Sequence, residues 1–157
     1  MDVSILQKVK IQAQVLVPLV KALQAELGED KANDLVRRAL ADLYRSFGEQ
    51  WWKSLEGDSV RAKVTAGFQA YQAEKSLVYE VVENAEDDVQ VNVTGCRFAE
   101  FYKAIGAPEL GFLLTCSSDF PIAEGFGPDV EFTRTQTIMQ GASHCNFRYR
   151  GRTGGAT

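Results

Sequence analysis

The residues of this chain best suited to chemistry lie in its last third. The ten residues from Gly141 to Arg150 contain the single histidine, His144, followed directly by Cys145. Cys116 and Asp119 lie upstream, three positions apart at the end of a predicted helix, and share one face of that helix if it continues. A thiolate with an acid–base partner can attack an electron-poor carbon, so these residues are candidates for nucleophilic catalysis.

The reactivity of the cysteines depends on their surroundings. A carboxylate raises the pKa of a thiol, so Cys116 would need His144 or an arginine nearby to form a thiolate. On a regular strand His144 and Cys145 point to opposite faces, although a β-bulge would change this. Cys96 is the third cysteine. Each of the three could instead be an inert buried residue.

A zinc site is a further possibility, formed by Cys96, Cys116, His144 and Cys145. The chain has no C-x2-C pair, however, and adjacent residues 144 and 145 diverge on a strand. We therefore predict no metal and no organic cofactor. The cysteines are odd in number and widely spaced, which favours reduced thiols in a cytoplasm over disulfides.

A buried arginine is expected on the predicted strand Val130–Met139. Arg134 and Gln136 interrupt an otherwise apolar face of this strand. A guanidinium there needs an anion, which is either a carboxylate of the chain itself or that of a bound small acid. Arg148, on the strand predicted from His144 to Arg150, is the alternative ligand for such an acid.

The elements that position these residues follow from hydrophobic periodicity. Residues 6–27 carry one helical stripe with a kink expected near Pro18 and a stop at Gly28, and Gly48 could end or weaken the second helix. Three helices are predicted in residues 6–27, 29–47 and 60–71; a hairpin in 76–83 and 89–93; two short helices in 97–105 and 108–116; a loop with at most one helical turn in 119–128; and a second hairpin in 130–139 and 144–150.

This order predicts an α+β fold, with the N-terminal helices packed on an antiparallel sheet of about four strands built from two hairpins, and two short helices between the hairpins. Residues 1–150 form one domain and residues 151–157 a flexible tail. The apolar stripe of the first helix could exceed what one domain buries, so a homodimer through the N-terminal helices is a further prediction.

Composition narrows the range of partners. The chain has 157 residues, 45% of them hydrophobic, and a formal net charge of -4. An acidic chain is a poor ligand for nucleic acid, and no uncharged apolar run reaches the ~20 residues of a membrane-spanning helix. The N-terminus also lacks the pattern of a secretory signal. We therefore expect a cytoplasmic protein that binds a small molecule, with no nucleic acid and no membrane partner.

Four segments of the chain resemble the L-2-amino-thiazoline-4-carboxylic acid hydrolase family. They match in order and spacing and are Asn92–Phe101, Leu113–Asp119, Arg134–Gly141 and His144–Tyr149. Family members often carry Asp where Asn146 stands here. The resemblance implies hydrolytic opening, at a carbon–nitrogen bond, of a small carboxylate-bearing cyclic amidine or sulfur–nitrogen heterocycle, which gives an N-carbamoyl-cysteine-type product.

Two mechanisms are compatible with this resemblance. In the first, a cysteine thiolate attacks the amidine carbon, Cys116 before Cys145, while His144 and Asp119 shuttle protons. In the second, Asp119 or Glu100 activates water directly and the cysteines are structural. Substrate-binding roles are predicted for Arg134, Arg148, Glu100 and Gln136, with one of the arginines holding the substrate carboxylate. The alternative function is a ligand-binding or sensor domain without catalysis.

Overall fold

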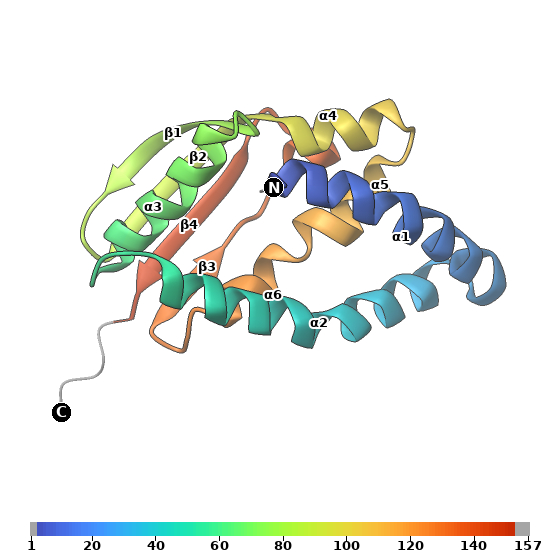
Figure 1. The fold of residues 1–157 in the computed structure, drawn as a ribbon, viewed down its shortest axis with the longest axis horizontal. Coiled ribbons are helices and arrows are strands. Elements are labelled where there is room, and N and C mark those ends of the chain that lie inside the picture. The colour runs from blue at the N-terminus through green and yellow to red at the C-terminus, as the bar shows by residue number, and fades with distance from the viewer. Residues whose placement is uncertain (1–2, 153–157) are drawn as a thin grey trace.

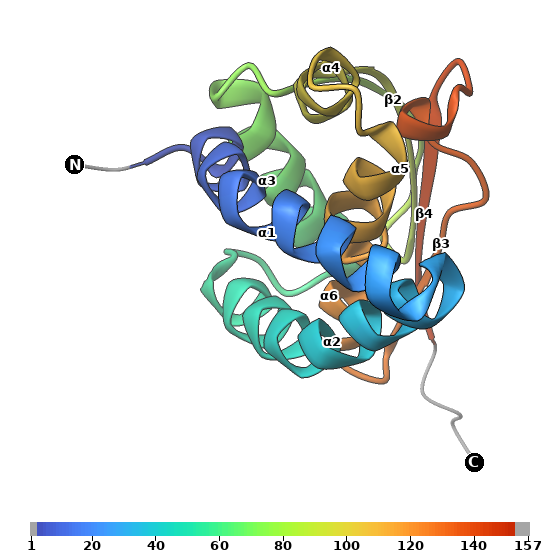
Figure 2. The same cartoon turned by 90° about the vertical axis from the view of Figure 1, so that its right-hand side faces the viewer.

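The computed structural model describes residues 3–152 and has an α+β fold, as predicted. Helices cover one side of a four-stranded antiparallel sheet (Figure 2). In chain order the elements are α1 (Ile5–Leu27), α2 (Glu29–Ser54), α3 (Val60–Ala73), β1 (Leu77–Asn84), β2 (Asp88–Cys96), α4 (Arg97–Ala104), α5 (Pro108–Gly111), the π-helix η1 (Phe112–Cys116), α6 (Asp119–Glu124), β3 (Val130–Thr133), the 3-10 helix η2 (Ile138–Gln140) and β4 (Cys145–Gly151).

The first three helices have clear local causes. α1 begins at a capping box in which Ser4 and Gln7 exchange side-chain-to-backbone hydrogen bonds, and α3 begins at Ser59, whose side chain caps its first turn. Gly28, with φ 82°, separates α1 from α2, so these two long helices run antiparallel (Figure 1). The predicted boundary at Gly28 is therefore confirmed.

Gly48 does not end the second helix but lies buried inside α2. A Cβ at Gly48 would lie 2.0 Å from the carbonyl oxygen of Ile122, and one at Gly125 would lie 2.2 Å from that of Arg45. The two glycines thus let the backbones of α2 and α6 touch. This close approach fixes the position of α6 and of Asp119 at its first residue.

The sheet joins the two hairpins through their central strands, in the order β1-β2-β4-β3. Val91 of β2 lies opposite Phe147 of β4, and Val93 opposite Cys145. Side chains alternate, so the buried Val89, Val91 and Val93 face the helices with Cys145 and Tyr149. This helix-facing side of the sheet forms one wall of the core.

The predicted second hairpin is too long on its first strand. β3 ends at Thr133 instead of Met139, and η2 follows at Ile138. The side chain of Asn146 replaces the strand ladder, because its Oδ1 accepts hydrogen bonds from the backbone N–H groups of Thr135 and Gln136 at 2.9 and 3.0 Å. The chain therefore leaves the sheet just where Arg134 turns inward.

Two further boundaries differ from the prediction. The expected loop of residues 119–128 contains α6, because Pro121 lies in the first turn, where no helical N–H is lost. Gly151, assigned to the tail, pairs with Val130 in the sheet. Residues 153–157 of the predicted tail lie outside the described residues.

The first helix buries part of its apolar stripe within this chain. Leu6, Ala13 and Val20 are buried, while Ile11, Val15 and Leu19 form a second row that is 53–67% exposed. A homodimer through this row stays a prediction. Within residues 3–152, no helix combines the length and apolar composition needed to cross a membrane.

Candidate functional site

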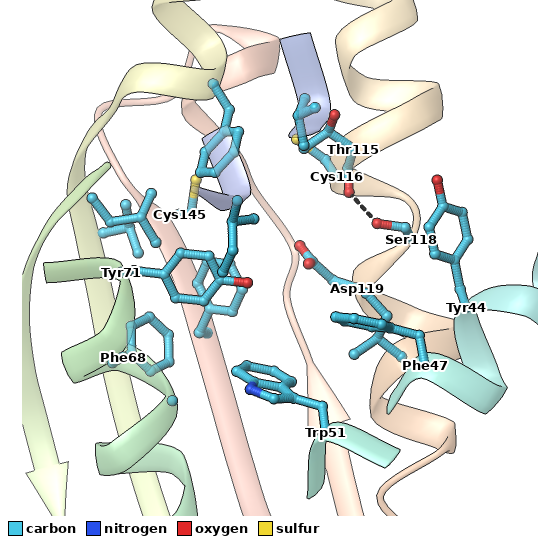
Figure 3. A pocket seen from close by; sticks show the side chains of 18 of the residues that line it. Tyr44, Phe47, Trp51, Phe68, Tyr71, Thr115, Cys116, Ser118, Asp119 and Cys145 are labelled. Atoms are coloured by element: carbon cyan, nitrogen blue, oxygen red, sulfur yellow. Dashed lines mark hydrogen bonds between the residues drawn. The ribbon is translucent and has the colours of Figure 1, made fainter. Parts of the chain in front are cut away.

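A cavity of about 360 Å³ lies between the helices and the sheet (Figure 3). Residues from α1, α2, α3, β2, α4, η1, α6 and β4 line it. Its walls are mainly aromatic, with rings from Tyr44, Phe47, Trp51, Trp52, Phe68, Tyr71, Phe98, Tyr102, Phe126, Phe147 and Tyr149. Such a lining with a few polar groups is typical of a small-molecule site.

The aromatic walls are held by ring-to-ring contacts. The ring of Trp51 lies edge-on to that of Tyr71, with centroids 6.2 Å apart, and tilted against Phe126 at 5.9 Å. Trp52 stacks on Phe126 at 4.4 Å, and Phe68 contacts Tyr71 at 6.4 Å. These arrangements are the favoured geometries of aromatic pairs, so the walls form a preorganised surface.

The π-helix η1 carries Cys116 to the cavity. Such turns are rare and are frequent at functional sites. Its last three carbonyl groups accept hydrogen bonds from the hydroxyl of Tyr44 at 3.2 Å, the hydroxyl of Ser118 at 2.6 Å and the guanidinium of Arg134 at 3.0 Å. Side chains from three different segments therefore fix the turn that leads into Asp119.

Arg134 forms an internal ion pair with Asp119, one of the two alternatives for its partner. Its Nη1 donates to Oδ2 of Asp119, and its guanidinium lies over the rings of Phe120 and Phe147, 5.2 and 5.7 Å from their centroids. The Arg134 side chain is 2% exposed, whereas that of Asp119 is 32% exposed. The carboxylate therefore faces the cavity, and the arginine supports it from behind.

Asp119 is the acid with the most unusual environment in this site. Burial raises its pKa to about 6, against the opposing effect of Arg134. Its Oδ1 accepts no hydrogen bond from the described residues, so one carboxylate oxygen is open to a ligand or to water. A carboxylate with a pKa near the working pH is suited to general acid–base catalysis.

All three cysteines line the same cavity. Burial raises the pKa of the Cys116 thiol, and the adjacent Asp119 raises it further. Burial also raises the pKa of Cys145, and that of Cys96 to about 11. Near neutral pH the three groups are therefore thiols, which are weak nucleophiles.

Two of the cysteines have structural partners. The sulfur of Cys96 accepts from the N–H of Ala99 at 3.4 Å, so it caps α4, and that of Cys145 accepts from the N–H of Ile138 at 3.2 Å, where the chain enters η2. These bonds account for the positions of Cys96 and Cys145 without a reaction.

His144 lies apart from the cavity. Its ring contacts the hydroxyl of Ser143 at 2.9 Å and the amide of Gln136 at 3.4 Å, and the same amide donates to its carbonyl group at 3.0 Å. Cys145, the next residue, lines the cavity, while neither His144 nor Gln136 does. The structure therefore separates the histidine from Cys116 and Asp119.

Arg148 and Glu100 are also placed away from the cavity. Arg148 donates to the carbonyl groups of Val91 and Phe147 and to the side chain of Asn92 at 3.0 Å. Glu100 is exposed on α4. Of the nine residues predicted for the site, the cavity thus collects Cys96, Cys116, Asp119, Arg134 and Cys145.

Tyr71 is a cavity residue that the sequence did not suggest. Its hydroxyl and the carboxylate of Asp119 point into the same space (Figure 3), and this hydroxyl forms no hydrogen bond to the described residues. Burial and the charge of Asp119 raise its pKa, so it remains a donor at neutral pH. In the sequence it continues an apolar helical stripe, which is the pattern of a core residue.

The polar groups do not form a metal site. Across residues 3–152, no three His, Cys, Asp or Glu side chains are grouped so that they could hold a metal ion. The polar groups that line the aromatic cavity include one carboxylate, three thiols and the hydroxyls of four tyrosines.

The fold is that of a small α+β domain that encloses a cavity with mainly aromatic walls. The family model described as L-2-amino-thiazoline-4-carboxylic acid hydrolase matches residues 8–149, so the chain belongs to this family. The resemblance stated from the sequence is thereby confirmed, and the family name supports a hydrolase function. A comparison with curated proteins finds no match.

A solved structure shares the fold. It is the crystal structure of the phenol-responsive sensory domain of the transcription activator PoxR with phenol, which is 14% identical to this chain. The match covers 87% of this chain and 72% of the other, with a TM-score of 0.52. At this identity the likeness concerns the fold alone. One scaffold thus serves a sensory domain and a family named for hydrolysis.

Proposed function

We propose that this chain is a hydrolase that opens a small cyclic amidine in the cavity, with Asp119 activating the attacking water. The observation that carries the proposal is the carboxylate of Asp119, held by Arg134 through one oxygen and open to the cavity through the other, with a pKa of about 6. Family membership supports the reaction class. Of the two mechanisms open from the sequence, this is direct water activation, with Asp119 in place of Glu100.

The reaction balances with one water molecule. Asp119 takes a proton from the water as the water oxygen bonds to the amidinium carbon, and the electrons of the carbon–nitrogen double bond move to nitrogen. When the carbon–sulfur bond of the ring then breaks, Asp119 returns that proton to sulfur, and the hydroxyl proton leaves to water as the urea carbonyl forms. The product is an N-carbamoyl thiol. Addition therefore occurs at the carbon–nitrogen bond, and cleavage at the carbon–sulfur bond.

Tyr71 is placed to donate a hydrogen bond to the tetrahedral intermediate from the side opposite Asp119. Replacing it with phenylalanine keeps the ring contacts with Trp51 and Phe68 and removes only the hydroxyl. We expect Tyr71→Phe to lower kcat by about 10- to 100-fold, with little change in the melting temperature, because the lost hydrogen bond stabilises mainly the transition state. Steady-state kinetics test this, and unchanged kcat would exclude the role.

The cysteines are expected to be dispensable for turnover. Cys116→Ala should change kcat by less than about tenfold, well below the 10²- to 10⁴-fold effect of a general acid–base group. The reason is that burial and Asp119 keep the thiol protonated. Single-turnover mass spectrometry should find no substrate adduct on Cys116. A trapped S-cysteinyl isothiourea adduct, in a protein whose Cys116→Ala variant loses turnover, would instead establish covalent catalysis.

The protonation of Asp119 should give activity and folding stability opposite dependences on pH. Activity should rise with pH through about 6, as Asp119 loses its proton and becomes a base. The folded pKa lies above the ordinary value of 3.8, so the folded state binds this proton more tightly than the unfolded state. The contribution of Asp119 to stability is therefore fully present below about 4 and is lost as pH rises to about 6. Profiles of kcat/KM and urea denaturation test both signs, and Asp119→Asn should lack both slopes.

A second candidate function is ligand binding without reaction. The aromatic lining favours it, and the PoxR sensory domain, which has the same fold, is described as phenol-responsive. The two functions differ in turnover. Incubation of excess 2-amino-thiazoline-4-carboxylate with the protein, followed by product analysis, distinguishes release over many cycles from binding at one molecule per chain.

A further inference from the structure

We propose that Nη2 of Arg134 binds the carboxylate of the substrate inside the cavity, beside the carboxylate of Asp119, so that Arg134 is the residue that selects for acids. This inference rests on the proposed function, since it assigns the residue that recognises the substrate in the same cavity. The sequence left two arginines open for this role. Arg148 lies outside the cavity and donates to groups of the sheet.

Arg134 is a buried guanidinium with more donors than partners. Its Nη1 donates to the backbone carbonyl of Cys116 and to Oδ2 of Asp119. Its Nε and Nη2 have no hydrogen-bond partner among the described residues. A buried donor without a partner is costly, so a further acceptor at this arginine would stabilise it.

The two unpartnered nitrogens of Arg134 differ in accessibility. Among the described residues, Nε of Arg134 is the one side-chain nitrogen or oxygen that is both fully enclosed and without a partner. Nη2 also lacks a partner and is therefore not fully enclosed. Because Arg134 lines the cavity, a ligand there can reach Nη2 but not Nε.

The charged residues around the cavity have room for an anion. Among the described residues that line it, Lys8, Lys63 and Arg134 are cations, and Asp119 is the one anion. Lys63 donates to the backbone carbonyl of Trp52 at 2.7 Å, and its Nζ lies over the Trp52 ring, 5.2 Å from the centroid. A bound carboxylate would therefore offset an excess of positive charge.

Lys8 is the alternative cation for this carboxylate, and it is the weaker one. It is exposed on α1, and an exposed ion pair typically shifts an equilibrium by no more than about fivefold. Arg134 is buried, and a buried hydrogen bond to a charged group contributes about 10- to 100-fold. The planar guanidinium also matches the geometry of a carboxylate better than an ammonium does.

A carboxylate at Nη2 would orient the ring for the reaction. In 2-amino-thiazoline-4-carboxylate a single nitrogen separates the carbon that bears the acid from the amidine carbon. Binding of the acid at Arg134 thus brings the amidine carbon towards Asp119 and the hydroxyl of Tyr71, which point into the same space (Figure 3). The protonated amidine supplies the second positive charge, so two cations then balance two carboxylates.

Three probes that differ at one position of the ring test the inference on the full chain. They are 2-amino-thiazoline-4-carboxylate, its 4-carboxamide and unsubstituted 2-amino-thiazoline, each measured for Kd by calorimetry and for kcat/KM by product formation. We expect the carboxylate to be preferred over the carboxamide by about 10- to 100-fold, because the amide has the same shape and no charge. Equal values for the acid and the amide would overturn the inference.

Arg134→Lys tests whether this preference comes from the arginine. Lysine keeps a positive charge beside Asp119, but it lacks the fork that presents separate nitrogens to two carboxylates. The ratio of acid to amide should fall about tenfold or more, and any damage to Asp119 affects both probes alike. Arg148→Lys is the matched control and should leave the ratio within about twofold. If Lys8→Ala removed the preference and Arg134→Lys kept it, the exposed lysine would bind the acid and the inference would be wrong.

A second measurement needs only the wild-type protein and so does not depend on the folding of Arg134→Lys. A substrate carboxylate beside Asp119 disfavours the ionised form of that side chain, so the pKa in the pH profile of kcat should be higher with the carboxylate than with the carboxamide. Both probes contain the same amidine, whose effect therefore cancels. Identical profiles for the two probes would contradict the inference.

The failure of this inference differs from the failure of the proposed function. Turnover of all three probes without a preference for the acid would overturn the inference and leave the hydrolase in place. A preference for the acid in Kd that is lost in Arg134→Lys, with no turnover of any probe, would support the carboxylate site and contradict hydrolysis.

Discussion

Replacing Asp119 with asparagine is expected to lower kcat/KM by about 10²- to 10⁴-fold, the usual effect of removing a general acid–base group. Asparagine keeps the shape of the side chain, and its oxygen can still accept the hydrogen bond from Arg134. It cannot take a proton from water. The loss should therefore appear mainly in kcat, measured with any cyclic amidine that the wild type turns over.

The matched control is Glu100→Gln. Glu100 is the other carboxylate considered as a base from the sequence, and it lies exposed on α4 outside the cavity. We expect this variant to have wild-type kinetics. Because asparagine leaves the buried charge of Arg134 without a counterion, the melting temperature of Asp119→Asn must be measured in parallel. A folded Asp119→Asn protein with wild-type turnover would exclude Asp119 as the base.

Replacing Gly48 with alanine should destabilise the protein by about 3 kcal/mol or more, at the upper end of the cost of overpacking. The added Cβ would lie 2.0 Å from the carbonyl oxygen of Ile122, which is a backbone atom and cannot turn aside. α6 would have to move away from α2, and Asp119 at its start would move with it. Turnover of the remaining folded protein should therefore fall as well.

Urea denaturation of Gly48→Ala beside Ser46→Ala measures this effect. Ser46 is exposed on the same helix, two residues away, so its replacement should change the free energy of unfolding by less than about 0.5 kcal/mol. A Gly48→Ala protein as stable as the control would mean that α2 and α6 are not held together at this point.

Local patterns predicted the parts of the fold that local forces determine. The stripe of α1 and its end at Gly28, the third helix and the first hairpin all appear as expected. The errors arose where contacts with a segment distant in the sequence determine the local structure. Gly48 continues its helix because α6 crosses it, and β3 stops at Thr133 because the Asn146 side chain takes the next backbone N–H groups.

The candidate site was also predicted only in part, because packing between distant segments determines which side chains face the cavity. Strand alternation separated His144 from Cys145, but which face of β4 meets the helices is decided by the packing of β2 beside it. The spacing of Cys116 and Asp119 placed both at one site, since three residues apart on helical turns share a face. Tyr71 was missed because a residue that faces an internal cavity has the same helical spacing as one that faces solid core.

Because this fold occurs with different functions, the function of this chain has to be tested directly. A family named for hydrolysis and a sensory domain have this fold, so the architecture alone does not choose between reaction and binding. In this chain the choice depends on Asp119. Its open oxygen and its pKa of about 6 suit proton transfer, whereas a site for binding alone has no need of a base.

The most direct test is multiple-turnover hydrolysis by the metal-stripped wild-type protein, with substituted and unsubstituted 2-amino-thiazolines in large excess. Product would be followed by liquid chromatography and mass spectrometry. We predict many molecules of an N-carbamoyl thiol per chain, at a rate that rises with pH through about 6. Saturation at one bound, unchanged molecule per chain at every pH would contradict hydrolysis and assign the cavity to ligand binding.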